Sequence, residues 1–335
     1  MKANWWSKRI MAASMGMWLL FTGNTLAARS EAAEPEREPA LPVITAPPTT
    51  VPVTEPPETE SRQRYLACEE IARQADGRQI FVYDGDREEM VYCSSEETEA
   101  LYPASITKLY SALVALKYLD PETVVTAGNE LKLVKSGSSR AYVTKGCRLT
   151  VEMLVEAMVI PSGNDAAYVL AAAAGRAIAG DGKLDAYTAV EVFLEEMNRM
   201  GKELGLENSH FANPDGFHSE AHFMCAGDVA KVGALALDNP VIAKYINLQQ
   251  DSVTFASGEH IAWYNTNHLI NPESPYYEPF AVGMKTGYTD EAGHCLLAAF
   301  RDGHRQIIVG IFGAEKPYQR YDDAGKLFEA CVIAG

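Results

Sequence analysis

The sequence predicts a mixed α/β fold, in which an antiparallel sheet is flanked by helices and joined to a helical lobe. Two apolar runs, residues 295–300 and 306–312, flank an Asp302-Gly303 turn, which is the pattern of a β-hairpin. A long helical stretch at residues 121–248 separates these strands from an earlier helix. We therefore expect a sheet layer, a helical lobe and a cleft between the two.

The first 28 residues have the features of a signal peptide. Basic residues precede an apolar stretch at residues 10–21, and small residues near Ala28 offer a cleavage site. The apolar part is shorter than the roughly 20 residues that span a bilayer, so cleavage is favoured and an uncleaved anchor is the alternative. We expect an exported protein without stable membrane insertion after cleavage.

Residues 29–62 are rich in Pro, Glu and Thr. Such a segment cannot bury a core, and we interpret it as an extended linker. The remaining chain, residues 63–335, is long enough for one sizeable α/β domain, which we expect to carry the activity.

The first candidate site is Ser105-x-x-Lys108, at the start of a predicted helix. Pro103 favours a helix start, and apolar residues follow at helical spacing, namely Leu109, Leu113 and Leu116. Ser105 and Lys108 therefore project from one face of the first turn. Serine becomes a nucleophile when a neighbour takes its proton, and a lysine can do so when burial lowers its pKa.

The second candidate motif is Ser162-Gly163-Asn164. An amphipathic segment at residues 149–160 is stopped by a proline, and an Ala-rich helix is expected at residues 165–175. The motif is thus a tight turn between two helices. Such a turn can present a hydroxyl and an amide to a cleft.

The third candidate motif, Lys285-Thr286-Gly287, follows an apolar run at residues 280–284. The predicted hairpin of residues 295–312 comes next. We therefore expect Lys285 on a strand edge, where it can face the helix that carries the nucleophile.

In this order, the three motifs resemble those of the low-molecular-weight penicillin-binding D-alanyl-D-alanine carboxypeptidases, a group related to β-lactamases and transpeptidases. The resemblance covers roughly residues 64–332. Within it, residues 79–92 look like the family's opening hairpin, and residues 211–228 are similar to its N-P-x-G-L…H…D segment. Residues 283–293 are close to the family form. The resemblance implies a β-lactamase/D,D-peptidase-like fold.

The resemblance also implies the catalytic roles. Ser105 would be the nucleophile that forms an acyl-enzyme, and Lys108 its general base. Ser162 would pass the proton toward the leaving amine. The oxyanion hole would consist of the backbone N–H groups of Ser105 and Tyr288.

The implied substrate-binding residues are Asn164, Lys285, Thr286, Gly287, Tyr288 and Arg320. By resemblance, Asn164 would position the substrate amide and help to hold Lys108. Lys285 would keep the local potential positive. With Thr286 and Arg320, it would meet the terminal carboxylate of the substrate.

The implied activity is that of a serine-type D-Ala-D-Ala carboxypeptidase in the cell-wall space. It would remove the terminal D-Ala of peptidoglycan stem peptides and be inhibited covalently by β-lactams. The alternatives are a D,D-endopeptidase, a β-lactamase and a non-catalytic penicillin-binding receptor. The sequence lacks E-x-x-L-N between the second and third motifs, which disfavours a class A β-lactamase. Intact motif side chains disfavour the receptor.

Net charge and histidine spacing argue against several classes of ligand. The formal net charge of −16 argues against nucleic acid or an anionic membrane surface as partner. His218 and His222 are spaced i, i+4, but no third ligand follows at metal spacing, so we expect no metal and no cofactor.

Six cysteines permit several disulfide pairings. In the resembled family the first helix, here residues 61–74, and the last helix, here residues 322–331, lie together. This arrangement would bring Cys68 near Cys331 and allow a disulfide between them. We expect Cys295 to be a buried free thiol rather than a nucleophile.

Overall fold

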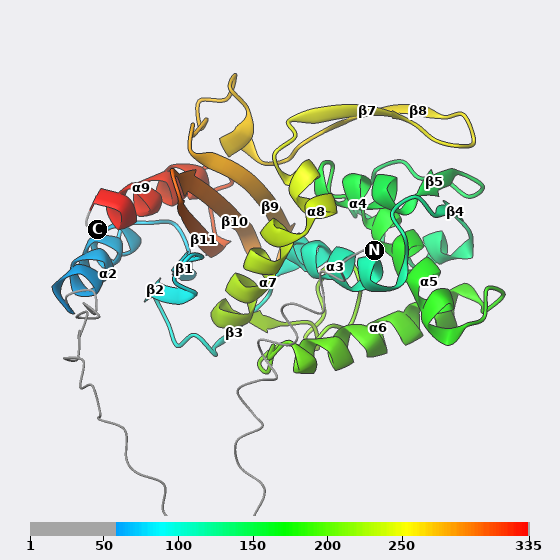
Figure 1. The fold of residues 1–335 in the computed structure, drawn as a ribbon, viewed down its shortest axis with the longest axis horizontal. Helices are drawn as coiled ribbons and strands as arrows, with labels where there is room; N and C mark the ends of the chain where they lie inside the picture. Colours follow the sequence, from blue (N-terminus) through cyan, green and yellow to red (C-terminus); the bar gives the residue numbers. More distant parts are fainter. Residues whose placement is uncertain (1–57, 334–335) are drawn as a thin grey trace, which may run out of the picture. The chain divides into compact units, whose positions relative to one another are not determined.

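The structure is a computed structural model that describes residues 58–333 (Figure 1). The predicted signal peptide, residues 1–28, lies outside the described residues. Helix α2 (Glu58–Ala72) begins inside the predicted linker, because its Glu, Arg and Gln residues favour a helix once the prolines end. Within residues 58–333, no helix is both long and apolar enough to cross a membrane.

The core of the domain is a five-stranded sheet in the order β2-β1-β11-β10-β9. Each neighbouring pair is antiparallel, as predicted. The strands are β1 (Gln79–Asp84), β2 (Glu89–Cys93), β9 (Ala281–Thr289), β10 (Gly293–Asp302) and β11 (Arg305–Ala314). The hairpin of β10 and β11 and the strand-edge position of Lys285 on β9 are therefore both confirmed.

Helices cover both faces of this sheet, which explains why β10 and β11 are almost continuously apolar. Helix α9 (Gln319–Ile333) packs on one face, and α2 lies beside it (Figure 1). Helix α7 (Ala226–Asp238) packs against β11 and β1 on the opposite face. The expected pairing of the first and last helices is confirmed. Helix α9 starts before the predicted residue 322, so Arg320 lies in its first turn.

The helical lobe lies where the sequence predicts it. Its helices are α3 (Thr107–Tyr118), α4 (Val151–Val159), α5 (Asn164–Ala179), α6 (Ala186–Glu203) and α8 (Pro240–Ile246), and α7 joins it to the sheet. A Cβ at Gly175 would lie 1.8 Å from the carbonyl oxygen of Ala189 on α6. Helix α5 continues to Ala179, so the prediction that it ends at Gly175 is wrong. Gly175 lies inside the helix, where its lack of a side chain lets α5 and α6 approach closely.

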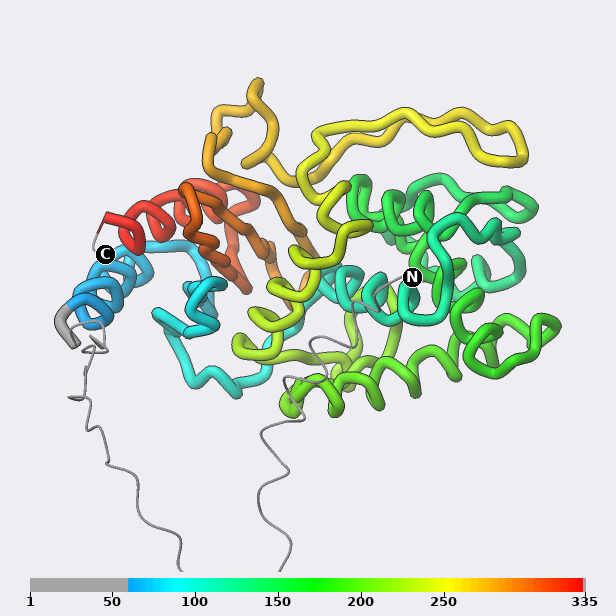
Figure 2. The backbone as a smooth tube through the Cα atoms, in the orientation of Figure 1, coloured from blue at the N-terminus to red at the C-terminus, as the bar shows by residue number. Residues whose placement is uncertain are grey.

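Short elements connect the sheet and the lobe. They are the strand pairs β3 (Ala100–Leu101) with β6 (Met224–Cys225), β4 (Val124–Thr126) with β5 (Arg148–Thr150), and β7 (Gln250–Thr254) with β8 (His260–Tyr264), and the 3₁₀ turns η1 (Ala104–Ile106), η2 (Asn129–Leu133) and η3 (His268–Ile270). Figure 2 shows the β7–β8 hairpin, in yellow, running above the helical lobe in this view.

Candidate active site

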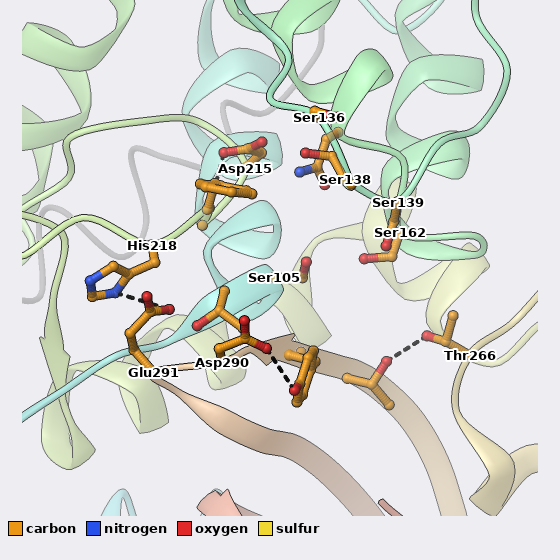
Figure 3. A pocket seen from close by; sticks show the side chains of 18 of the residues that line it. Ser105, Ser136, Ser138, Ser139, Ser162, Asp215, His218, Thr266, Asp290 and Glu291 are labelled. Atoms are coloured by element: carbon orange, nitrogen blue, oxygen red, sulfur yellow. Dashed lines mark hydrogen bonds and ion pairs between the residues drawn. The ribbon is translucent and has the colours of Figure 1, made fainter.

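A cleft of about 510 Å³ opens between strand β9 and the helical lobe. Residues from all three motifs line it: Ser105, Ser162, Asn164, Thr286, Gly287, Tyr288 and Arg320. In Figure 3, Ser105 lies near the centre, with Ser162 on one side and His218 and Glu291 on the other. Lys108 and Lys285 are buried, with 0% and 1% of their surface exposed. The structure thus brings all the sequence-predicted site residues to one place.

Ser105 and Lys108 contact each other, as their spacing in the sequence predicts. Lys108 Nζ donates hydrogen bonds to Ser105 Oγ at 2.7 Å and to the carbonyl oxygen of Asp215 at 2.8 Å. Burial lowers the pKa of Lys108 to about 8, although the charges of Asp215 and Asp165 act in the opposite direction. A lysine with this pKa is partly neutral near neutral pH, so it can accept the serine proton.

The backbone is left-handed at each of the three motifs. The φ angle is 46° at Ala104, 63° at Ser162 and 105° at Met284, directly before Lys285. Such conformations cost non-glycine residues on the order of 1–3 kcal/mol and persist only when the surrounding structure enforces them. The residue types gave no sequence signal for this feature. The strain coincides with the positions that aim the motif side chains into the cleft.

Two glycines allow the chain to pack closely around Ser105. A Cβ at Gly287 would lie 2.9 Å from the Cβ of Ala104 and 3.0 Å from the backbone nitrogen of Ser105. A Cβ at Gly216, whose φ is 80°, would lie 1.8 Å from the carbonyl oxygen of Ala104. Strand β9 and the segment after Asp215 therefore approach the turn before Ser105 more closely than any other residue type allows.

The second motif is tied to a polar wall that the sequence analysis did not single out. The backbone N–H of Asn164 donates to the carbonyl oxygen of Ser139 at 2.9 Å. The Asp165 carboxylate accepts the N–H groups of Ala141 and Val143 at 2.8 and 2.9 Å. These bonds hold residues 136–139 against the cleft that they line. Their Ser and Gly content indicates only a loop.

The third motif contributes a buried lysine. Lys285 Nζ donates to the carbonyl oxygen of Thr286 at 3.0 Å. Burial, and then the charges of Lys108 and Arg320, lower the pKa of Lys285 well below its ordinary value. Arg320 is also buried, and its Nη2 donates to the Tyr321 hydroxyl at 3.2 Å.

The Nε and Nη1 atoms of Arg320 have no hydrogen-bond partner within the described part of the chain. Neither Arg320 nor Lys285 forms an ion pair with a carboxylate of residues 58–333. Buried donors and charges without partners are costly. An anion in the cleft beside these residues would satisfy the donors and favour the protonated form of Lys285.

The two histidines considered as metal ligands have other contacts. The ring of His222 accepts from the N–H of Ala212 at Nδ1 and contacts the Thr107 hydroxyl through Nε2. His218 Nδ1 lies 3.7 Å from Glu291 Oε2, across the cleft rim. Among the described residues, no group of three His, Cys, Asp or Glu side chains is placed to hold a metal ion. His222 instead braces the turn that carries Ser105.

The family of the chain follows from a direct match. Residues 68–316 match the model of the D-alanyl-D-alanine carboxypeptidase family of serine peptidases. The chain belongs to this family. It is 29% identical over 276 residues to the D-alanyl-D-alanine carboxypeptidase DacF of Bacillus subtilis, covering 82% of this chain and 66% of that protein. It is also 29% identical over 232 residues to a D-alanyl-D-alanine carboxypeptidase of Streptomyces strain K15, covering 67% and 76%.

Match coverage ranges from about half to about three quarters of the length of the curated relatives that the chain resembles, these two included. Solved structures confirm the predicted fold class. The Streptomyces K15 DD-transpeptidase has a TM-score of 0.68 at 24% identity, covering 77% of this chain and 98% of that chain. Penicillin-binding protein D2 from Listeria monocytogenes, in its ampicillin-bound form, has a TM-score of 0.62 at 22% identity and the same coverage.

Proposed function

We propose that this protein is a serine-type D-Ala-D-Ala carboxypeptidase that removes the terminal D-Ala of peptidoglycan stem peptides. The observation that carries the proposal is the 2.7 Å hydrogen bond from Lys108 to Ser105, at a cleft that also holds the buried cation Arg320. The first feature supplies an activated nucleophile. The second suits a substrate with a free terminal carboxylate. Family membership supports the same activity.

In the proposed acylation step, neutral Lys108 takes the proton of Ser105 Oγ as the oxygen attacks the carbonyl carbon of the penultimate D-Ala. The oxyanion that forms accepts the backbone N–H groups of Ser105 and Tyr288. The proton then passes from Lys108 through Ser162 to the nitrogen of the leaving D-Ala. An ester between Ser105 and the shortened peptide remains, and water hydrolyses it.

The cleft also accounts for substrate orientation. Thr286 Oγ1 is hydrogen bonded to Thr266 Oγ1 and lies on the strand that carries Lys285. We assign Thr286, Lys285 and Arg320 to the terminal carboxylate, and Asn164 to the backbone of the penultimate residue. Gly287 lets the substrate strand lie close to Ser105 because it has no side chain.

The same geometry predicts covalent inhibition by β-lactams. A peptide loses D-Ala by diffusion after acylation, so water can enter beside Lys108 and Ser162. The leaving group of a β-lactam stays attached and blocks that approach. The sequence has no E-x-x-L-N glutamate to activate a water from another side, which favours a long-lived adduct over β-lactamase activity.

The domain organisation and location belong to this proposal. Residues 1–28 would be a signal peptide, residues 29–62 a linker and residues 63–335 the catalytic domain. The enzyme would act outside the cytoplasm, in the cell-wall space. The basic, apolar and small-residue pattern of the first 28 residues supports export, and the substrate class requires it.

Release of free D-Ala from diacetyl-Lys-D-Ala-D-Ala tests the proposed function. The wild-type chain is expected to release D-Ala over many turnovers, and Ser105→Ala is expected to release none above the uncatalysed rate. The control is Ser95→Ala, which changes the same residue type outside the cleft. Absence of release from folded wild type, or equal release by Ser105→Ala, would overturn the proposal.

A further inference from the structure

Asp215 is a buried carboxylic acid that the proposed mechanism leaves unused. It is 1% exposed and lies on the cleft wall near Ser136 and Ser138 (Figure 3). Its Oδ1 accepts the N–H of Phe217 at 3.1 Å. Its Oδ2 is buried and has no hydrogen-bond partner in residues 58–333. The family-like N-P-x-G-L pattern does not specify which residue occupies this position.

The neighbour of Asp215 is the proposed general base. The main-chain oxygen of Asp215 accepts a hydrogen bond from Lys108 Nζ at 2.8 Å, across 107 positions of sequence. The side chains of the two residues form no ion pair within residues 58–333, but the charge of Asp215 raises the pKa of Lys108 and the charge of Lys108 lowers the pKa of Asp215. Gly216 fixes this segment against the turn before Ser105. Asp215 therefore reaches Lys108 through both its backbone and its charge.

Charged and polar groups face this pair from each element that packs around it. The group comprises Asp165, Tyr168 and Asn164 on α5, Lys285 on β9, and His222 after the Asp215 turn. Asp165 has both oxygens engaged by backbone N–H groups. Lys285 and Lys108 disfavour each other's protonated form, because two positive charges at this distance repel. Unlike Asp165, Asp215 has a carboxylate oxygen, Oδ2, without a hydrogen-bond partner in residues 58–333. The charge on this oxygen can stabilise Lys108 when Lys108 becomes protonated.

We propose that Asp215 is a positioning residue that sets, through its negative charge, how strongly Lys108 binds the proton of Ser105. The proposal rests on the proposed function, because it takes Lys108 to be the general base. A buried amine beside Lys285, without a counter-charge, would be a weak base. The ionised carboxylate stabilises the ammonium form that appears as Ser105 attacks.

The proton balance of the step is simple. Ser105 Oγ loses its proton to Lys108 Nζ, and the O–C bond to the substrate forms. The Lys108 ammonium keeps its hydrogen bond to the Asp215 carbonyl and gains attraction to the carboxylate. The proton then leaves through Ser162 to the departing amine. Burial raises the pKa of the Asp215 carboxyl group, while the charge of Lys108 and the N–H of Phe217 lower it. Above that pKa the carboxylate takes up no proton in this step, and its charge acts on the Lys108 ammonium.

The test is the pH dependence of the rate at which benzylpenicillin acylates the full chain. The rate of wild type is expected to rise with pH through about 8, because Lys108 must be neutral to act. Asp215→Asn keeps the shape and the carbonyl oxygen of residue 215 but removes the charge. In a plot of acylation rate against pH, we expect the rising limb of this variant to move to lower pH by about one pH unit. Removing a nearby opposite charge typically shifts a pKa by about 1–3.

The plateau rate of Asp215→Asn at high pH is expected to fall by about threefold to tenfold, because a weaker base transfers the proton more slowly. Asp215→Glu restores the charge and is expected to return the limb toward its wild-type position. A purely structural role of Asp215 would lower the rate at every pH without moving the limb. Thermal unfolding of each variant establishes that it is folded, and Asp215→Ser replaces Asp215→Asn if the latter is not.

Two control variants separate charge from burial. Tyr168→Phe removes a hydroxyl near Asp215 without changing charge. Glu196→Gln removes a buried carboxylate of α6 that is not among the charges acting on Lys108. Although burial acts in the opposite direction, hydrogen bonds from Arg199 and Tyr118 lower the pKa of Glu196 to about 2, so this group is ionised over the tested range. Both variants are expected to keep the wild-type limb. A shift as large in Glu196→Gln as in Asp215→Asn would overturn the proposal.

Failure of this inference can be told from failure of the proposed function. Penicillin acylation requires Ser105 and Lys108 but no release of D-Ala. If wild type releases no D-Ala while the Asp215→Asn limb moves, the proposed function fails and the inference stands. If wild type releases D-Ala and the limb of Asp215→Asn stays in place, the inference alone is overturned.

Discussion

Two of the regions in which the domain buries charge, behind the sheet and in the cleft, differ in how that charge is paired. Behind the sheet, Arg64 forms a 2.6 Å ion pair with Asp84 and also donates to Cys331 Sγ at 3.2 Å. In the cleft, Lys285 and Arg320 are equally buried but have no carboxylate partner among the described residues. The ion pair behind the sheet stabilises the fold. In the cleft, Arg320 has buried donors without partners, and burial favours the neutral form of Lys285.

This difference has an energetic cost. A buried charge without a partner, such as that of Arg320, destabilises a fold by several kcal/mol, which the rest of the domain must offset. Lys285 avoids part of this cost because its lowered pKa favours the neutral amine. The left-handed residues Ala104, Ser162 and Met284 add to the cost at the same place. The comparison therefore predicts that changes in the cleft alter chemistry, and that changes behind the sheet alter stability.

The largest expected effect is that of Lys108→Arg. Arginine keeps the positive charge but does not lose its proton in proteins, so it cannot take the proton of Ser105. Acylation by benzylpenicillin is expected to slow by about 10²–10⁴, the usual contribution of a positioned base. Lys117→Arg, in the last turn of the same helix, is the matched control. Near-normal acylation by Lys108→Arg would show that charge, and not basicity, is what the site needs.

Asp84→Asn is expected to act on stability instead. It leaves the buried Arg64 charge without its partner, and breaking one side of a buried ion pair costs about 3–5 kcal/mol. Urea unfolding should show a lower midpoint, while the folded fraction should acylate at the wild-type rate. Glu220→Gln, at an exposed position, provides the baseline. A loss of acylation rate without a loss of stability would reverse the comparison.

The thiol pair behind the sheet offers a third test. Cys68 on α2 and Cys331 on α9 are fully buried free thiols. The neighbouring Cys68 thiol, and then Arg64, lower the pKa of Cys331. During refolding, while both thiols are still accessible, the thiolate of Cys331 can attack oxidised glutathione and Cys68 can resolve the mixed disulfide, which releases two glutathione thiols.

The resulting disulfide is expected to raise the free energy of unfolding by about 2–4 kcal/mol without changing acylation. The measurement is peptide mapping of unreduced protein after refolding in oxidised glutathione, with unfolding curves before and after reduction. Cys295, which is buried elsewhere against Tyr102 and Ala292, serves as the internal free-thiol reference. Alkylation of Cys68 and Cys331 as free thiols in that sample would refute the disulfide.

Gly287→Ala is expected to have the smallest of these effects. Its methyl group would force β9 away from Ala104 and Ser105 by a few tenths of an ångström. Misplacement of that size is expected to slow acylation by about tenfold, since about 1 Å can cost 10². Gly182→Ala, in open space, is the control. An unchanged rate would mean that the strand adjusts freely and that the close approach has no catalytic role.

Local chemistry predicted much of the fold and the site. The Asp302-Gly303 turn between two apolar runs predicted the hairpin of β10 and β11, and the spacing of Ser105 and Lys108 predicted one shared helix face. Both features depend on neighbours in sequence. Such patterns can be recognised in one sequence because side chains return to the same face at a fixed spacing in a helix or a strand.

The features that the sequence did not predict depend on contacts between distant residues. Asp215 meets Lys108 only because the Gly216 turn packs on Ala104. Gly175 looks like a helix end until α6 is placed against it. The left-handed φ of Met284 is imposed by its surroundings, and methionine has no preference for it. Burial and tertiary packing, rather than local propensity, decide these positions.

The most direct test of the account is the mass of the protein after exposure to benzylpenicillin. Wild type is expected to gain the mass of one penicillin, located on the peptide that contains Ser105, and the adduct should persist while D-Ala release from peptide continues over many turnovers in a parallel sample. Ser105→Ala is expected to gain nothing. Labelling of Ser105→Ala at the wild-type rate, or an adduct on another residue, would contradict the assignment of the cleft as the catalytic centre.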